Sequence, residues 1–169
     1  MAKSRSSAAA REAEPAPAPE PWTVERSAEL YRIDAWGEGF FFINEQGHAS
    51  VRHLPDDDVA IDLVDVVAEI RRRNAGFPVV IRFQDVLRAR VRRLNEAFAA
   101  AVAESGYANV YRGVYPIKVN QMHEVVEEVL DAGKPWSMGL ECGSKAELVA
   151  ALPHIDNGRL LLCNGVKDR

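Results

Sequence analysis

The sequence contains few cysteines, no long apolar run and no excess of positive charge. Two cysteines in 169 residues, Cys142 and Cys163, are too few for a disulfide framework and are not spaced as zinc ligands. No apolar run approaches the roughly 20 residues of a membrane-spanning helix. The formal net charge of −4 argues against a polyanion-binding protein. These absences predict a globular cytoplasmic protein with no membrane or nucleic-acid partner.

The N-terminal residues lack the features of both a folded segment and a secretory leader. Residues 1–21 are rich in alanine, proline and glutamate and have no apolar period. Their basic residues are not followed by the continuous apolar stretch that a secretory signal requires. We therefore expect residues 1–21 to form a disordered tail.

Residues 22–54 are predicted to be a β-strand segment. From residue 29 onward the sequence reads as short strands interrupted by glycine. The stretches FFFIN and ASVRH flank a turn, N-E-Q-G, in which Gly47 can take the positive φ angle that a hairpin needs.

The pattern changes after Pro55. Three aspartates at 56–58 suit a helix start, because carboxylates cap free amides and oppose the helix dipole. FPVVIRF, at 77–83, reads as a strand, and residues 85–105 as the clearest helix. The apolar stripe of that helix is expected to consist of Leu87, Val91, Leu94, Phe98 and Ala101.

The second half of the chain alternates strands with helices. YRGVYPIK, SMGLEC and LLLCNG read as strands, HEVVEEVLDAG and residues 144–152 as helices. Ser144 and Glu147 have the S-x-x-E form of a capping box. This alternation predicts right-handed βαβ units and a parallel sheet, in either an open doubly wound fold or an α/β barrel. The chain stops directly after a strand, so we expect it to be the front part of a longer protein.

Lys118 ends the strand YRGVYPIK, and in parallel α/β folds the C-terminal strand ends carry the chemistry. In a regular strand Val114, Pro116 and Lys118 point to one side, while Tyr115 and Ile117 point to the other. Desolvation at such a place can lower a lysine pKa and allow the amine to form a Schiff base with an aldehyde. Spacing alone equally allows a lysine that reaches from the strand end into solvent.

Other polar residues have simpler interpretations. We expect His123 to be a surface or capping residue at the start of its helix, and both cysteines to be small core residues. An arginine-rich helix without interleaved aromatics favours a solvated face over a nucleic-acid stripe. Those arginines are Arg82, Arg88, Arg90, Arg92 and Arg93. No metal ligands and no glycine-rich phosphate loop are predicted.

Five segments resemble the biosynthetic arginine decarboxylases, which belong to the fold type III, alanine-racemase-like group of pyridoxal-phosphate decarboxylases. The resemblance covers residues 22–169, in the same order. It implies that Lys118 holds pyridoxal phosphate as an internal Schiff base, and that residues 55–169 are the first part of a pyridoxal-phosphate-binding eight-stranded (β/α) barrel behind a β-rich domain. The segments are WGEGFFFIN, FPVVIRFQDVLRARVRRLNEAF, YPIKVNQ, GLECGSKAEL and LLLCNGVKDR.

The resemblance also implies an activity: decarboxylation of L-arginine to agmatine and carbon dioxide, in polyamine biosynthesis. Lys118, once released, would serve as a proton carrier. LECGSKAEL also resembles the corresponding stretch of ornithine decarboxylase, where acidic residues lie near the cofactor lysine. Glu141 and Glu147 are therefore candidates for the cofactor environment, although capping is the favoured role of Glu147. The resemblance allows Mg²⁺ as a second cofactor and a homo-oligomer of the full-length protein.

Two alternatives to an arginine decarboxylase stay open. The same scaffold could decarboxylate ornithine, lysine or diaminopimelate, because the specificity pocket is expected beyond Arg169. A non-catalytic carrier of pyridoxal phosphate would also hold its cofactor on a strand-end lysine, but such carriers lack a β-rich extension. The chain taken alone should be inactive, since it holds only about four of the eight strands of a barrel.

Overall fold

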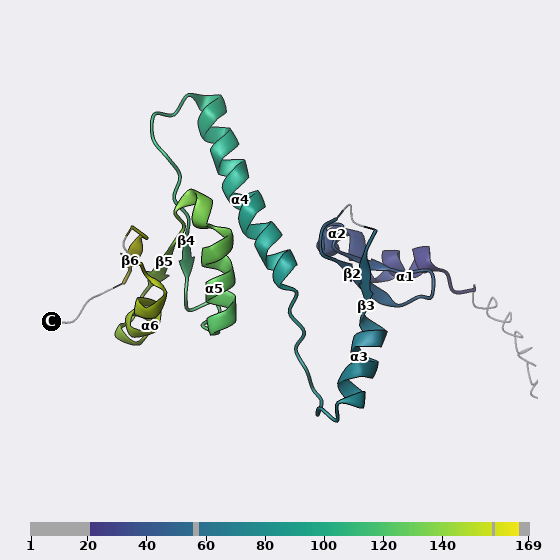
Figure 1. Cartoon of the computed structure of the whole chain (residues 1–169). Coiled ribbons are helices and arrows are strands. Elements are labelled where there is room, and N and C mark those ends of the chain that lie inside the picture. The colour runs from purple at the N-terminus through teal and green to yellow at the C-terminus, as the bar shows by residue number, and fades with distance from the viewer. Residues whose placement is uncertain (1–20, 56–57, 157, 166–169) are drawn as a thin grey trace, which may run out of the picture.

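The computed structural model describes residues 21–55, 58–156 and 158–165, which contain an antiparallel sheet of order β1-β2-β3 and a parallel sheet of order β4-β5-β6. In Figure 1 the long helix α4 stands between the two sheets. The predicted α/β class, with short antiparallel strands ahead of parallel ones, is therefore confirmed. Except for its last residue, the predicted tail over 1–21 lies outside the described part of the chain. No helix in that part is both long and apolar enough to cross a membrane.

Two short helices, α1 (Val24–Tyr31) and α2 (Ile33–Gly37), precede the first sheet. The prediction of strands from residue 29 onward is therefore wrong for residues 29–37, which lie in these two helices and the residue between them. The Thr23 hydroxyl accepts a hydrogen bond from the Arg26 N–H at 3.2 Å and so caps α1. Ile33 is only 3% exposed, so α2 is held by burial on one side. Capping and burial together favour helix over strand here.

The predicted hairpin is confirmed as β1 (Phe41–Ile43) paired with β2 (Ala49–Arg52). Gly47 has a φ of 82° and its N–H donates to the Asn44 carbonyl at 2.9 Å. A side chain at Gly47 would be strained by this φ angle, and its Cβ would also lie 2.6 Å from the Trp22 ring.

The antiparallel sheet continues into β3 (Ala60–Asp62), which pairs with β2 and leads into α3 (Leu63–Arg72). The prediction that this helix starts at 56–58 is therefore wrong; Asp56 and Asp57 lie outside the described residues. The cap is Asp62, whose Oδ1 accepts the Val64 N–H at 2.8 Å. Its Oδ2 lies 2.7 Å from His48 Nδ1, so the same carboxylate also holds the hairpin.

The segment FPVVIRF forms no strand, so the strand predicted at 77–83 is wrong for the described chain. Residues 75–83 carry no helix or strand and connect α3 to α4. Val80 is 75% exposed. A β-branched run becomes a strand only when a neighbouring edge pairs with its N–H and C=O groups, and no described strand reaches this one.

The predicted long helix is confirmed as α4 (Gln84–Ser105), but only part of its apolar stripe is buried. Val91 is 7% exposed, whereas Leu94 and Phe98 are 47% and 44% exposed. The residue buried beside Val91 is the polar Asn95, whose side chain donates to the Val91 carbonyl at 2.8 Å. The helix therefore buries a narrower face than its periodicity predicts.

The parallel sheet consists of β4 (Val114–Pro116), β5 (Gly139–Cys142) and β6 (Leu161–Cys163), with β5 in the middle. Its connections contain α5 (His123–Ala132), α6 (Lys145–Ala151) and two short 3-10 helices, η1 (Lys134–Trp136) and η2 (Leu152–His154). All three predicted strands and both predicted helices are present, which confirms the βαβ alternation.

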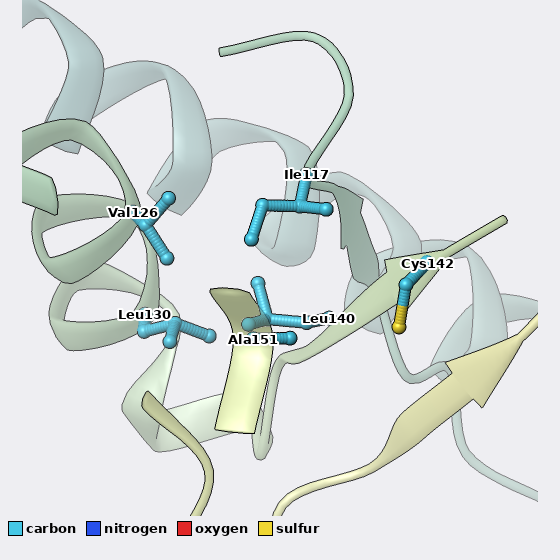
Figure 2. Close-up of a cluster of buried hydrophobic side chains, with 6 residues drawn as sticks. All are labelled: Ile117, Val126, Leu130, Leu140, Cys142 and Ala151. Atoms are coloured by element: carbon cyan, nitrogen blue, oxygen red, sulfur yellow. The ribbon is translucent and has the colours of Figure 1, made fainter. Parts of the chain in front are cut away.

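Side chains from β5, α5, α6 and the end of β4 form one apolar cluster (Figure 2). Each is at most 2% exposed; the members are Ile117, Val126, Leu130, Leu140, Cys142 and Ala151. Cys142 is thus a core residue as predicted, but Cys163, its register partner on the edge strand β6, is exposed. The core prediction is wrong for Cys163 because no described element packs on the outer side of β6.

A second cluster joins α4 to α5. It contains Val91, Val125, Val129, Ala132 and Met138. At its border Arg88 of α4 forms ion pairs with Glu128 at 2.6 Å and Asp131 at 2.7 Å, both on α5.

The N-terminal end of α4 also contacts the antiparallel region. Glu38, which follows α2, forms ion pairs with Arg90 and Arg93. The Phe41 ring of β1 meets the Phe83 ring edge-on, with 6.0 Å between the ring centres.

Candidate functional site at the ends of the parallel strands

Lys118 lies in a tight turn immediately after β4. The Val119 N–H donates to the Pro116 carbonyl at 3.1 Å, so Ile117 and Lys118 occupy the two central positions of the turn. Ile117 is 1% exposed and anchored in the core, whereas the neighbouring Lys118 is exposed. Because the anchored residue adjoins the exposed one, the turn fixes where the amine emerges. The predicted position at a C-terminal strand end is confirmed; desolvation of the amine is not seen within the described residues.

No described residue forms a hydrogen bond or ion pair with the Lys118 amine. Most other charged side chains around the parallel sheet do have partners, as Arg88 and Arg159 illustrate. A lysine without a carboxylate partner keeps its amine available for another ligand.

The loop after Lys118 is tied to the sheet on its helix side. Tyr115 points toward the helices, packs against the apolar cluster and donates its hydroxyl to the Asn120 carbonyl at 3.3 Å. Burial raises the pKa of Tyr115, so the phenol stays protonated and can donate. The Asn120 side chain accepts the Met122 N–H at 3.1 Å just before α5 begins. These two bonds hold the loop that carries the lysine.

Pro116 is compatible with β4 because β4 is an edge strand of the described sheet. The Ile117 N–H donates to the Glu141 carbonyl of β5 at 3.0 Å. Backbone donors alternate in direction along a strand, so the nitrogen of Pro116 faces away from β5 and no ladder bond is lost. The strand thus keeps its pairing up to the residue before the lysine.

Glu141 is a buried carboxylate beside this strand end. It is in register with Pro116 and is 7% exposed. Leu140 and Cys142, its neighbours in β5, point into the apolar cluster, so the Glu141 side chain lies on the opposite face, with Pro116. Its Oε2 has no hydrogen-bond partner within the described residues. A buried oxygen without a donor is costly, so its donor must be supplied by water, a ligand or another segment.

Glu147 is engaged in capping α6, as predicted. Its N–H donates to the Ser144 hydroxyl at 3.2 Å, and its Oε2 accepts the Gly143 N–H at 2.7 Å. In the standard capping box the glutamate would accept from the capping residue itself, here Ser144, rather than from the residue before it. A role of Glu147 in the cofactor environment stays a prediction.

The loops that follow β5 and β6 meet at the same edge of the sheet. The Asn164 N–H donates to the Cys142 carbonyl at 2.8 Å. Gly165 has a φ of 85°, and a Cβ there would lie 3.3 Å from the Gly143 carbonyl oxygen. This edge therefore brings together a free amine, a buried carboxylate and closely packed backbone.

A separate cluster of polar side chains was not predicted from the sequence. His123 Nε2 lies 3.1 Å from Glu127 Oε1 on α5, and the His123 and His154 rings are 5.0 Å apart. The i, i+4 spacing of His123 and Glu127 was visible in the sequence, but His154 follows 27 positions later with no motif to link it.

Comparison with known proteins connects the lysine-bearing region to one family. No protein-family model matches the chain. It is 49% identical over 151 residues to the biosynthetic arginine decarboxylase of Parasynechococcus marenigrum (strain WH8102), a match that covers 89% of this chain and 23% of that protein. It is 47% identical over 158 residues to biosynthetic arginine decarboxylase 1 of Synechocystis sp. (strain ATCC 27184 / PCC 6803 / Kazusa), covering 88% of this chain and 23% of that one.

A solved structure shows the same likeness in three dimensions. The crystal structure of the biosynthetic arginine decarboxylase from Campylobacter jejuni superimposes with a TM-score of 0.73 at 33% identity, over 82% of this chain and 22% of that one. The resemblance predicted from the sequence is therefore confirmed, and with it the α/β fold of the opening part of the barrel. The chain spans about a quarter of the length of the relatives that it matches.

Proposed function

We propose that this chain is the lysine-bearing part of a pyridoxal-phosphate-dependent arginine decarboxylase that forms agmatine and carbon dioxide for polyamine biosynthesis. One observation carries the proposal: Lys118, exposed and without a partner among the described residues, follows a parallel strand at the edge where Glu141 is buried. The similarity to biosynthetic arginine decarboxylases over nearly nine-tenths of the chain supports the choice of reaction.

The residues present fit pyridoxal phosphate in two respects. A cofactor aldehyde needs an accessible primary amine, and Lys118 offers one. A protonated ring or substrate amine would supply a donor for the orphaned Oε2 of Glu141. When bound, the cofactor acts as an electron sink for the charge left when carbon dioxide departs.

The roles of the chain's own residues follow from their positions. Lys118 Nζ would hold the cofactor covalently and, after displacement by the substrate amine, would carry a proton to the substrate carbon. Ile117 and Tyr115 orient the turn by anchoring it in the core and to Asn120. Glu141 would stabilise positive charge near this edge, and Glu147 would keep the start of α6 in place.

A non-catalytic cofactor carrier is disfavoured by one feature. The sheet β1-β2-β3 gives the chain the β extension that such carriers lack. Arginine is preferred over ornithine, lysine or diaminopimelate only through the named relatives. We also propose that residues 1–169 alone are inactive, because they correspond to about a quarter of those proteins.

The attachment of the cofactor can be tested by chemical labelling. The protein expressed from its complete reading frame is loaded with pyridoxal phosphate, reduced with borohydride and digested. We expect the pyridoxyl label on the peptide that contains Lys118. A label on any other lysine would contradict the site.

The reaction can be tested by substrate competition on the same preparation. Carbon dioxide release is measured with arginine, ornithine, lysine and diaminopimelate at equal concentrations. Arginine should give the highest kcat/KM. Faster turnover of another amino acid would reject the substrate while leaving the lysine assignment intact, and release from none of them would favour the carrier.

A further inference from the structure

We infer that His123, Glu127 and His154 form a binding site for a divalent transition metal of the Zn²⁺ class. The three ligand atoms lie within 4.8 Å of one another. No ion is present, and nothing in the proposed decarboxylation uses these residues.

The site is built from two elements. His123 and Glu127 are one helical turn apart on α5, so their side chains share a face, and Nε2 lies 3.1 Å from Oε1. His154 ends η2, and its ring tilts by 41° against that of His123 at a centroid distance of 5.0 Å. The third ligand therefore comes from a different part of the sequence and is brought near the helical pair by the tertiary fold.

The separations suit a tetrahedral ion. Zn²⁺ binds histidine nitrogen and carboxylate oxygen at about 2.0–2.2 Å, so two ligands in a tetrahedron lie about 3.4 Å apart. The His123–Glu127 pair is already close to that separation. Both side chains are more than half exposed, so small rotations can bring all three ligand atoms onto one ion and leave the fourth position to water.

The chemistry of the ligands selects the metal. Two imidazoles and one carboxylate are the set found in three-ligand zinc sites, whereas Mg²⁺ and Ca²⁺ prefer oxygen alone.

The surroundings favour a cation. His154 and Glu127 line a hollow of about 600 Å³ that also carries other carboxylates, with Arg159 as a lining cation. Arg159 lies 3.4 Å from Asp156, so its charge is partly balanced. The other lining carboxylates are Glu124, Glu128, Asp131 and Asp156, of which Glu128 and Asp131 form ion pairs with Arg88, so the carboxylates outnumber the two arginines.

The test is a zinc-binding measurement that does not depend on activity. The protein expressed from its complete reading frame is stripped with EDTA and titrated with Zn²⁺ against a chromophoric chelator. We expect one equivalent whose affinity falls at least about tenfold in His154→Asn, since even outer-shell changes cost that much. Glu127→Gln should weaken the same equivalent, and a large excess of Mg²⁺ should not displace it.

The matched control is His53→Asn, which removes an exposed histidine in the antiparallel region and should leave zinc binding unchanged. Circular dichroism of each variant checks folding, and His123→Asn replaces His154→Asn if the latter does not fold. X-ray absorption of the zinc form should show nitrogen and oxygen ligands. Absence of the equivalent, equal binding by wild type and every folded ligand variant, or sulfur ligation would overturn the site.

Discussion

The two sheets of this protein are held together in different ways. In the antiparallel region, strands adjacent in sequence pair directly, and the carboxylate of Asp62 links hairpin and helix by bonding to Val64 and lying against His48. In the parallel region, strands are joined through helices, and side chains at most 2% exposed form the core. The predicted site residues all belong to the parallel region.

This difference has a physical cause. A hairpin is closed by a short turn, so its register follows from local sequence. Parallel strands need a crossover, so their register is set by packing between residues far apart in the chain. That packing brings successive strand ends to one edge, where Lys118 follows β4 and Glu141 lies on the neighbouring strand β5. The antiparallel region has no such edge.

The largest effect is expected at Lys118. Lys118→Ala in the protein expressed from its complete reading frame should abolish the visible absorbance of bound cofactor and lower turnover by orders of magnitude, because the covalent tether is lost. Lys118→Arg should be almost as damaging, since a guanidinium stays protonated and cannot form a Schiff base. Absorbance spectra and carbon dioxide release measure both. The control is Lys134→Ala, at an exposed lysine of η1. An equal loss of absorbance and turnover in this variant would refute the assignment of the cofactor to Lys118.

The next largest effect concerns the parallel core. Leu140 is fully buried, so Leu140→Ala should reduce the free energy of unfolding by about 2–5 kcal/mol. Leu94, on α4, is 47% exposed, and Leu94→Ala should cost much less. Urea denaturation followed by circular dichroism gives both values. Similar losses would mean that α4 buries its whole apolar stripe in solution.

A smaller effect compares the same capping bond in the two regions. Ser144→Ala removes the cap of α6, whose Ala151 is buried in the core, and should cost about 1 kcal/mol of unfolding free energy. Thr23→Ala removes the cap of α1, which has no buried residue. Fraying of α1 should therefore have less effect on global unfolding. A larger loss for Thr23→Ala would reverse the comparison.

The smallest effect is a pH dependence of the antiparallel region. The hydrogen bond with His48 and those from Val64 and Asn44 lower the pKa of Asp62. A carboxyl whose pKa is lower in the folded state stabilises it above the unfolded pKa, and that stability is lost as pH falls through the folded value. Asp62→Asn should thus lower the urea midpoint at neutral pH but not in strong acid. If the urea midpoints of wild type and Asp62→Asn differ by the same amount at neutral pH and in strong acid, the ionised Asp62 carboxylate does not stabilise the antiparallel region.

The sequence predicted the structure correctly wherever a feature depends on residues that are close together in the chain. The N-E-Q-G turn with Gly47, the Ser144 cap and the strand–helix alternation of the parallel region were all predicted correctly. The position of Lys118 at a strand end also followed, because a strand end is defined by its own residues and the turn after them.

Tertiary structure decided whatever depended on a distant neighbour. FPVVIRF has the composition of a strand but no described strand to pair with it, and α3 starts at Leu63 because Asp62 also bonds to the hairpin. Glu141 is buried without a donor for its Oε2, and Cys163 is exposed although its register partner is not. Periodicity records which residues share a face; only the packed chain decides what covers that face, because burial is a property of pairs of segments.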